Sequence, residues 1–368
     1  TLAGSTLALD ALDRPLTPLW LYADTRAWED ALVLRECLDE PANHQRTGVP
    51  LHPAYQPARL LWFQRQRPDM LQKAGRWVTL GEYLCLRLFG EMVVSTSIAS
   101  WTGLLNLHTQ AWDQDLLSAI PLQPRQLSRL VDASEPITGL RPEFAQRWPD
   151  LARVPWFPVI GDGAAANLGS GCVTSQELSV TIGTTSALRV VLERDAPLLP
   201  SGLWCYRLDR RRLLLGGALN EGGNLYAWLL ETLGLSDAPD LAAALQALPP
   251  DSGELTFLPF IDGERSPGWH SEARAAITGL TLSTTPLQIL QAGLEAVGYR
   301  LAEVCDLLQP YLPAQPTLVA SGGALQNSPA WLQILADVLG KPLVQCLFTE
   351  TSARGAALLG LEALGLIP

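Results

Sequence analysis

The spacing of apolar and polar residues divides the chain into two patterns that meet near residue 160. Up to about residue 156, apolar residues recur at helical spacing and predict amphipathic helices over 26–38, 57–66, 80–89 and 142–153. Residues 116–130 are predicted to be helical only in part, because prolines interrupt them. The proline-spaced segment 47–57 can be neither a helix nor a central strand, and we expect a shaped loop.

Short apolar strands become frequent after residue 162. The pattern predicts strands at 178–182, 188–192, 213–215, 317–320 and 343–346, with helices at 221–233, 286–308, 329–339 and 352–364. A loop is expected over 259–279. Three strands followed by alternating helices and strands are typical of the ribonuclease-H-like α/β arrangement, whose sheet binds ligands at the strand ends. We predict two domains, 1–173 and 174–368.

Two turns in the middle of the chain carry the residues best suited to chemistry. Val159 and Ile160 are expected to form a short strand that ends in Gly161-Asp162-Gly163, where a small-residue helix begins. The glycines would let a substrate approach the Asp162 carboxylate closely. The turn 183–186, Gly-Thr-Thr-Ser, offers N–H groups and hydroxyls to an anion such as phosphate. A carboxylate base beside a phosphate cradle suits phosphoryl transfer; the alternative is two ordinary turns.

Two more glycine turns further along the chain could also bind a ligand against their backbone. One is 220–224, at a predicted helix start, where a phosphate or close packing would both require small residues. The other is Ser321-Gly322-Gly323, whose glycines would let an adenosine press against the backbone while Asn327 bonds its ring or ribose. A tight turn that needs positive φ is the alternative explanation.

Charged and aromatic side chains outside the turns have two interpretations each. Asp24 can cap a helix, and Arg26 can bind a carboxylate or pair with a neighbour. His52 and Tyr55 lie on the proline-spaced loop, which forms either a substrate wall or a rigid connector. For the charges at 262–265 and 273–275, we favour a structural ion pair over a substrate contact.

Composition limits the classes of partner. The net charge of −11 disfavours nucleic acid and anionic membrane surfaces, although a local basic pocket for an anionic small molecule is compatible with it. No apolar run reaches membrane-spanning length and no signal peptide is visible. Six scattered cysteines are typical of reduced thiols in a cytoplasmic protein, and four histidines without ligand spacing make a dedicated zinc site unexpected.

In combination, the motifs resemble those of the FGGY carbohydrate kinases, and most closely the gluconokinase-like branch. Residues 22–26, 47–53 and 202–206 resemble the branch, whereas the family-wide motifs are 160–162, 182–184, 263–267, 322–324 and 352–357. The resemblance extends over essentially the whole chain. Each motif is weak alone, but their order and spacing together are specific.

The resemblance implies a two-domain, actin-like ATPase fold that closes on a sugar, ATP and Mg²⁺, with Asp162 as general base. It places the phosphates at Gly183, Thr184 and Thr185. The nucleotide would be lined by Gly223, Gly322, Gly323 and Asn327. On the sugar side we expect Asp24, Arg26, His52, Tyr55 and Gly163, and we assign no metal-binding side chain. These roles suit phosphoryl transfer, which depends on positioning and charge neutralisation.

Three departures from the family pattern stand out. Arg59 occupies a position where the first family signature has Lys, and Gly293 replaces a larger residue in the second, near 275–295. The family's opening strand with its Asp-x-Gly-Thr phosphate turn has no match, so we expect a first domain without its N-terminal strands. We also expect the 368-residue chain alone to be inactive and poorly stable, because those strands belong inside a sheet.

The leading hypothesis is an ATP-dependent kinase of a sugar or sugar acid, with gluconate as the first candidate substrate. Xylulose, or another pentulose or polyol, is the second. A catalytically inert sugar- or nucleotide-binding relative is the alternative, followed by another actin-like phosphotransferase or a sugar-sensing scaffold. Small molecules are the expected partners, and a homodimer is the expected assembly to test.

Overall fold

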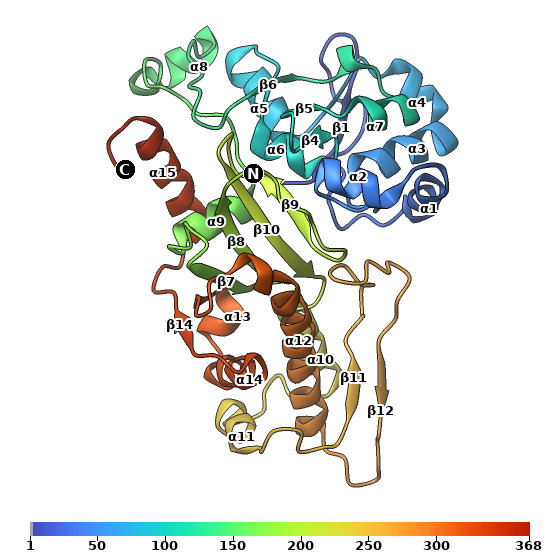
Figure 1. The fold of residues 1–368 in the computed structure, drawn as a ribbon, viewed down its shortest axis with the longest axis vertical. Helices are drawn as coiled ribbons and strands as arrows, with labels where there is room; N and C mark the ends of the chain where they lie inside the picture. The colour runs from blue at the N-terminus through green and yellow to red at the C-terminus, as the bar shows by residue number, and fades with distance from the viewer. Residues whose placement is uncertain (1–2) are drawn as a thin grey trace.

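A six-stranded sheet with helices on both faces organises the second half of the molecule (Figure 1). The computed structural model describes residues 3–368; Thr1 and Leu2, the first residues of the expected first domain, lie outside the described residues. The strands, in their order across the sheet, are β14 (Leu343–Gln345), β13 (Thr317–Ser321), β7 (Glu177–Ile182), β8 (Ser186–Glu193), β10 (Arg212–Leu219) and β9 (Trp204–Arg207).

The topology confirms the arrangement predicted from the sequence. β7 is central and pairs antiparallel with β8 and parallel with β13, which pairs parallel with β14. β10 pairs antiparallel with β8, so β7, β10 and β13 run in the same direction. Their carboxyl ends therefore meet at one edge of the sheet, where ligands bind in folds of this kind.

The two faces of the sheet bury different side chains because successive residues of a strand point to opposite sides. On β8, Leu188 and Val190 join the larger core, whereas Ala187 and Val191 join the core beneath α9. The helices of this half are α9 (Asp162–Gly169), α10 (Gly223–Thr232), α11 (Leu241–Ala247), α12 (Pro286–Leu308), α13 (Gly323–Gln326), α14 (Pro329–Leu339) and α15 (Thr351–Ala363). The ribbon β11 (Thr256–Leu258) with β12 (Ala276–Thr278) extends beside them, and Gln309–Tyr311 forms a 3-10 turn.

Capping residues explain why the helix bounds were predictable here. α12 starts with a capping box in which Thr285 and Gln288 satisfy each other's backbone N–H groups, with Pro286 as its first residue. α14 starts after the Ser328 cap and ends at Gly340, whose φ is 60°. Both helices have the bounds that the sequence predicts.

The first half of the chain is mostly helical and carries three two-stranded ladders. These ladders join β1 (Leu7–Leu9) to β2 (Arg76–Val78), β3 (Val93–Ser95) to β6 (Arg129–Val131), and β4 (Leu105–Asn106) to β5 (Ala111–Trp112). The helices are α1 (Trp28–Cys37), α2 (Glu40–Thr47), α3 (Gln56–Gln66), α4 (Pro68–Lys73), α5 (Leu80–Phe89), α6 (Thr96–Trp101), α7 (Gln114–Ala119) and α8 (Pro142–Arg147), with 3-10 turns at Pro124–Gln126 and Pro149–Leu151. Tryptophan and phenylalanine rings of this half pack together, including Trp20, Phe63 and Trp77.

The two halves meet along the edge strand β9. Its Cys205 N–H donates to the Gly48 carbonyl over 2.8 Å, and the His44 ring lies 2.8 Å from the Leu203 carbonyl oxygen. Gly48 has a φ of 77°, and a Cβ there would lie 2.1 Å from the Cys205 carbonyl oxygen. The proline-spaced segment is thus the expected loop between α2 and α3, and it protects the exposed edge of the sheet.

Three predicted elements differ in the structure, and one strand was missed. Residues 159–160 form no strand, because Ser95 Oγ donates to the Val159 carbonyl and the Gly161 N–H donates to Ser97 Oγ, so hydroxyls occupy these ladder positions. The helix expected over 142–153 ends at 147, since Pro149 restricts the residue before it and begins a 3-10 turn. Strand β9 was not predicted. The loop expected over 259–279 includes β12, which pairs with β11.

Helices α9 and α15 approach each other through glycine. A Cβ on Gly355 would lie 1.8 Å from the Ala165 carbonyl oxygen, and one on Gly169 would lie 1.8 Å from the Thr351 carbonyl oxygen. These are backbone atoms that cannot rotate away. The position of α9 on the sheet therefore depends on the absence of two side chains.

We expect Gly355→Ala to destabilise the fold by about 1–3 kcal/mol, because the added methyl forces α9 and α15 apart. Thermal unfolding measures this effect. Gly360→Ala is the matched control on α15, since a Cβ there would make only ordinary contact with Phe157 at 3.6 Å. Equal melting temperatures for the two variants would contradict the proposed constraint.

Candidate active site

A cavity between the two halves of the chain contains the side chains best suited to catalysis and ligand binding. Its charged lining residues are Asp162, Arg189 and Arg265. Thr185 and Gly163 line it as well, and the remaining wall is mostly aromatic: Tyr22, Tyr55, Trp101, Trp204 and Tyr206. A concave site with apolar walls and a few convergent polar groups is typical of small-molecule binding.

Asp162 reaches this cavity because it is the first residue of α9. Its side chain is exposed, and the preceding Gly161 is the extended N-cap. A Cβ on Gly161 would lie 2.7 Å from Trp101 Nε1, so the chain passes the indole ring only as glycine. The result is an accessible carboxylate held on a rigid helix, as the sequence predicts.

The three remaining glycine turns meet beside it at the carboxyl edge of the sheet. The N–H of Gly223 donates to the Gly183 carbonyl over 2.7 Å, and the N–H of Asn224 donates to the Thr184 carbonyl over 3.1 Å. Gly322 has a φ of 95°, and a Cβ on it would lie 2.3 Å from the Ile182 carbonyl oxygen. The turns that follow β7, β10 and β13 are thus brought together by backbone contacts.

Two glycines in these turns face open space. A Cβ built on Gly183 or on Gly323 would meet no heavy atom within 4 Å. Asn327 is the C-cap of α13, and its side-chain amide donates to the Gly323 carbonyl over 2.8 Å. Packing therefore explains Gly322 but not Gly183 or Gly323, and a ligand could lie directly against their backbone.

Stacked rings form one wall of the cavity. The rings of Trp101 and Tyr206 stack with centroids 3.9 Å apart, and Trp204 stacks on Tyr206 at 4.4 Å. The hydroxyls of Tyr55 and Tyr206 are 2.7 Å apart. Burial raises the pKa of Tyr55 to about 12 and raises that of Tyr206 above its ordinary value, so both rings keep their protons at neutral pH.

The expected sugar-side residues do not all reach this cavity. Tyr55 and Gly163 line it, but His52 is buried behind it, with its ring centroid 5.1 Å from that of Trp269. Asp24 and Arg26 pair with each other, Nε to Oδ1 at 2.9 Å, and are absent from the lining. α1 begins only at Trp28, so Asp24 caps a turn instead of the helix.

The site also contains residues that were not assigned to it from the sequence. The aromatic and charged ones are Tyr22, Trp101, Trp204, Tyr206, Arg189 and Arg265. Arg189 had a detectable signal, because it is the only charged residue between Ser186 and Leu192 in an otherwise apolar strand. Glu264, beside Arg265, is buried and forms a structural ion pair with Arg300, outside the two charged segments. Within residues 3–368 Arg265 and Arg274 form no ion pair, and Arg265 lines the cavity, so the structural pairing favoured for these segments holds for Glu264 alone.

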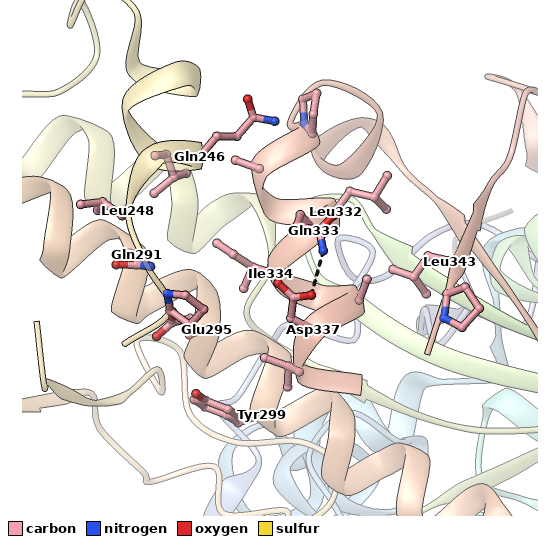
Figure 2. A pocket seen from close by; sticks show the side chains of 17 residues that line it. Gln246, Leu248, Gln291, Glu295, Tyr299, Leu332, Gln333, Ile334, Asp337 and Leu343 are labelled. Carbon is pink, nitrogen blue, oxygen red and sulfur yellow. Dashed lines mark hydrogen bonds between the residues drawn. The ribbon is translucent and has the colours of Figure 1, made fainter. Parts of the chain in front are cut away.

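A larger groove of about 1130 Å³ lies elsewhere, between α11, α12 and α14. Figure 2 shows Gln291, Glu295 and Tyr299 of α12 in this groove, opposite Gln333 and Asp337 of α14, which are hydrogen-bonded to each other over 2.7 Å. No residue that we assigned to a substrate or nucleotide lines it. The candidate active site is therefore the smaller cavity that contains Asp162.

Glu221 lies in the turn after β10 and is buried almost completely, at 1% exposure. Its Oε1 has no hydrogen-bond partner. Burial is the main cause that raises the pKa of this carboxyl, to about 7; its own backbone N–H and the charge of Arg300 oppose the increase, and the charges of Asp262 and Glu264 add to it. This residue titrates near neutrality at the base of the glycine turns.

Comparisons with known proteins identify the family. The family model for the FGGY family of carbohydrate kinases, N-terminal domain, matches residues 1–169, and the one for the C-terminal domain matches residues 178–364. The chain belongs to the FGGY family of carbohydrate kinases. The actin-like, two-domain fold and the kinase class expected from the motifs are thereby confirmed.

This FGGY kinase is similar in sequence or structure to several named sugar and sugar-acid kinases. It is 32% identical to the gluconokinase of Bacillus subtilis (strain 168), over 99% of this chain and 73% of the relative. It is 32% identical to the xylulose kinase of Escherichia coli (strain K12), over 92% and 69% respectively. The crystal structure of gluconate kinase from Lactobacillus acidophilus superposes with a TM-score of 0.90 at 27% identity, covering 99% of this chain and 74% of that one.

Kinases of this family use ATP, usually with a divalent metal ion. The open backbone at Gly183 and Gly323 fits a nucleotide. Within residues 3–368 no group of three or more His, Cys, Asp or Glu is positioned to hold a metal ion. No helix in the same residues is long and apolar enough to cross a membrane.

We expect Glu221→Gln to change how stability depends on pH. The folded protein keeps a proton on Glu221 up to about pH 7, whereas the unfolded chain loses it near 4.5, so this residue's contribution to stability is full below pH 4.5 and is lost as the pH rises to about 7. The variant should match wild type near pH 4.5 and exceed it at pH 8. Urea unfolding at both values measures this.

Glu231→Gln, an exposed carboxylate on α10, is the control and should shift neither curve. If the free energies of unfolding of wild type and Glu221→Gln differ by the same amount at pH 4.5 and at pH 8, Glu221 does not have the raised pKa.

Proposed function

We propose that this kinase transfers the γ-phosphate of ATP to a hydroxyl of a sugar acid, with gluconate as its substrate and Asp162 as general base. The observation that carries the proposal is that the exposed Asp162 carboxylate lines the same cavity as Thr185, on the loop where the backbone of Gly183 is open. A base and an anion cradle in one cavity are what phosphoryl transfer to a hydroxyl requires.

In the proposed step, the Asp162 carboxylate accepts the proton of the attacking hydroxyl as its oxygen bonds to the γ-phosphorus. The bond from phosphorus to the bridging oxygen breaks, ADP leaves, and Asp162 later releases the proton to water. The N–H groups and hydroxyls of Thr184 and Thr185 would bind phosphate oxygens. Gly223, Gly322, Gly323 and Asn327 would line the nucleotide, and bound Mg²⁺ would neutralise phosphate charge.

The aromatic wall supports a polyhydroxylated substrate. The stacked rings of Trp101 and Tyr206 line the cavity with apolar surface, and the neutral hydroxyls of Tyr55 and Tyr206, which are bonded to each other, are the polar groups of this wall. The gluconokinase relatives support gluconate, and xylulose is the second candidate because a xylulose kinase is equally identical over a shorter span. The division after residue 173 and a homodimer remain part of this proposal.

We predict that Asp162→Asn lowers kcat by about 10²–10⁴-fold while leaving ATP affinity unchanged, because the amide cannot accept the proton. A coupled assay that follows ADP release with gluconate, and titration calorimetry with ATP, measure the two quantities. Asp237→Asn makes the same chemical change at an exposed position and should retain turnover. Wild-type kcat in Asp162→Asn would remove this residue from the mechanism.

We also predict that Gly323→Ala weakens ATP binding by about tenfold without changing the melting temperature. The new methyl meets no protein atom within 4 Å, so it can clash only with a ligand that lies against this backbone. Calorimetry with ATP and thermal unfolding of the free protein separate the effects. Unchanged ATP affinity would show that the nucleotide does not contact Gly323.

A further inference from the structure

Two arginine side chains line the Asp162 cavity without an ion-pair partner. Neither Arg189 nor Arg265 forms a salt bridge with any residue in 3–368, although most other arginines that the structure describes in buried settings are paired or bonded. Both side chains are half-buried, but each has an Nε that is buried without a hydrogen-bond partner. A buried donor without a partner is energetically unfavourable, so the two side chains indicate an interaction that the free protein leaves unmade.

Arg189 extends from β8 toward the start of α9. A Cβ on Gly163 would lie 3.5 Å from its Nε, so the guanidinium lies next to the residue that follows the base. Its Nε is buried without a hydrogen-bond partner, and the only contact that its donors make with a described residue is a long one, 3.4 Å to Thr181 Oγ1. Most of its five N–H donors are free to bind a ligand.

Arg265 lines the same cavity and lies on the loop between β11 and β12. Its guanidinium carbon is 5.3 Å from the centroid of the Tyr22 ring, and its Nε is also buried without a hydrogen-bond partner. The two cations affect each other: burial lowers the pKa of Arg189, and the charge of Arg265 lowers it further, against the opposite effect of Asp162. The three charged side chains of the cavity wall thus sum to one excess positive charge.

We propose that Arg189 and Arg265 bind the carboxylate of the substrate and that Arg189 makes this cavity selective for a sugar acid over a neutral sugar, since Arg265 belongs to the family-wide motif 263–267. The proposal rests on the function proposed above and adds the residues that determine its substrate class. A guanidinium binds a carboxylate through two parallel N–H···O bonds, and a buried bidentate pair of this kind is strong and directional.

Two other anions or roles could use the same arginines, and each predicts a different measurement. If they bound the γ-phosphate, their removal would weaken ATP binding with every acceptor. If Arg189 served only to keep Asp162 ionised, its removal would shift the acid limb of the pH–rate profile equally for charged and neutral substrates. Selection for a substrate carboxylate predicts neither effect.

The test compares gluconate with gluconamide, which has the same hydroxyls and a neutral group of nearly the same shape. Titration calorimetry gives the affinity of the full-length enzyme for each ligand, and the coupled assay gives its kcat/KM. We expect wild type to prefer gluconate, and Arg189→Gln to lose about 100-fold in gluconate affinity while gluconamide affinity changes less than threefold. Arg265→Gln should change in the same direction.

Matched variants separate recognition from a structural effect. Arg189→Lys keeps the charge without the two-pronged geometry and should recover part of the preference for gluconate. Arg274→Gln removes an exposed arginine that bonds only the backbone carbonyls of Glu272 and Ala273, and it should behave as wild type. The melting temperature of Arg189→Gln should equal or exceed that of wild type, because a half-buried guanidinium with an unpaired buried Nε–H is removed.

The outcomes distinguish this inference from the proposed function. If wild type binds gluconate and Arg189→Gln and Arg265→Gln keep its full preference over gluconamide, the arginines do not select the carboxylate and the inference is wrong. Loss of ATP affinity alone, or an equal shift of both pH profiles, would also overturn it. If wild type binds ATP but neither gluconate nor gluconamide, the proposed substrate itself fails.

Discussion

The placement of α9 is the constraint on which the rest of the site depends. Its first residue is Asp162, its alanines rest on the sheet beneath it, and its last turn touches α15 through Gly169 and Gly355. Since backbone meets backbone at both glycines, α9 has no freedom to slide along α15. The same rigidity fixes the Asp162 carboxylate opposite the turns at the carboxyl edge of the sheet, where a ligand would have to lie.

Those turns depend on a second set of backbone contacts. Gly223 donates directly to the Gly183 carbonyl, so the loop after β10 supports the loop after β7 without any side chain between them. Glycine is required for contact at some positions and leaves open space at others, as Gly322 and Gly323 show side by side. A single glycine motif therefore combines a structural residue with one that packing alone does not explain.

The sequence predicted the order of most strands and helices along the second half of the chain and the bounds of α12 and α14, because these features depend on local capping and apolar periodicity. It also predicted Asp162 and the glycine turns, because these residues lie at the ends of elements. It failed at β9, where all four residues are buried and no alternation is visible. The local pattern was also misleading at 159–160, where a strand was expected. The backbone there hydrogen-bonds to hydroxyls of residues distant in the sequence instead of to another strand.

Long-range contacts also explain why the sugar-side residues were the least predictable part of the site. Asp24 and Arg26 are complementary neighbours, and their mutual pairing satisfies them outside the cavity. Arg189 shows the opposite behaviour, because its strand brings it beside the start of α9, where it forms no ion pair within 4 Å with any residue in 3–368 and shares the cavity with a second arginine. A sequence motif reports which charges are adjacent along the chain, whereas binding depends on the charges that folding leaves unpaired. An arginine in an apolar strand can therefore mark a binding site as well as a motif does, since a half-buried guanidinium without a partner is unfavourable until a ligand supplies the opposite charge.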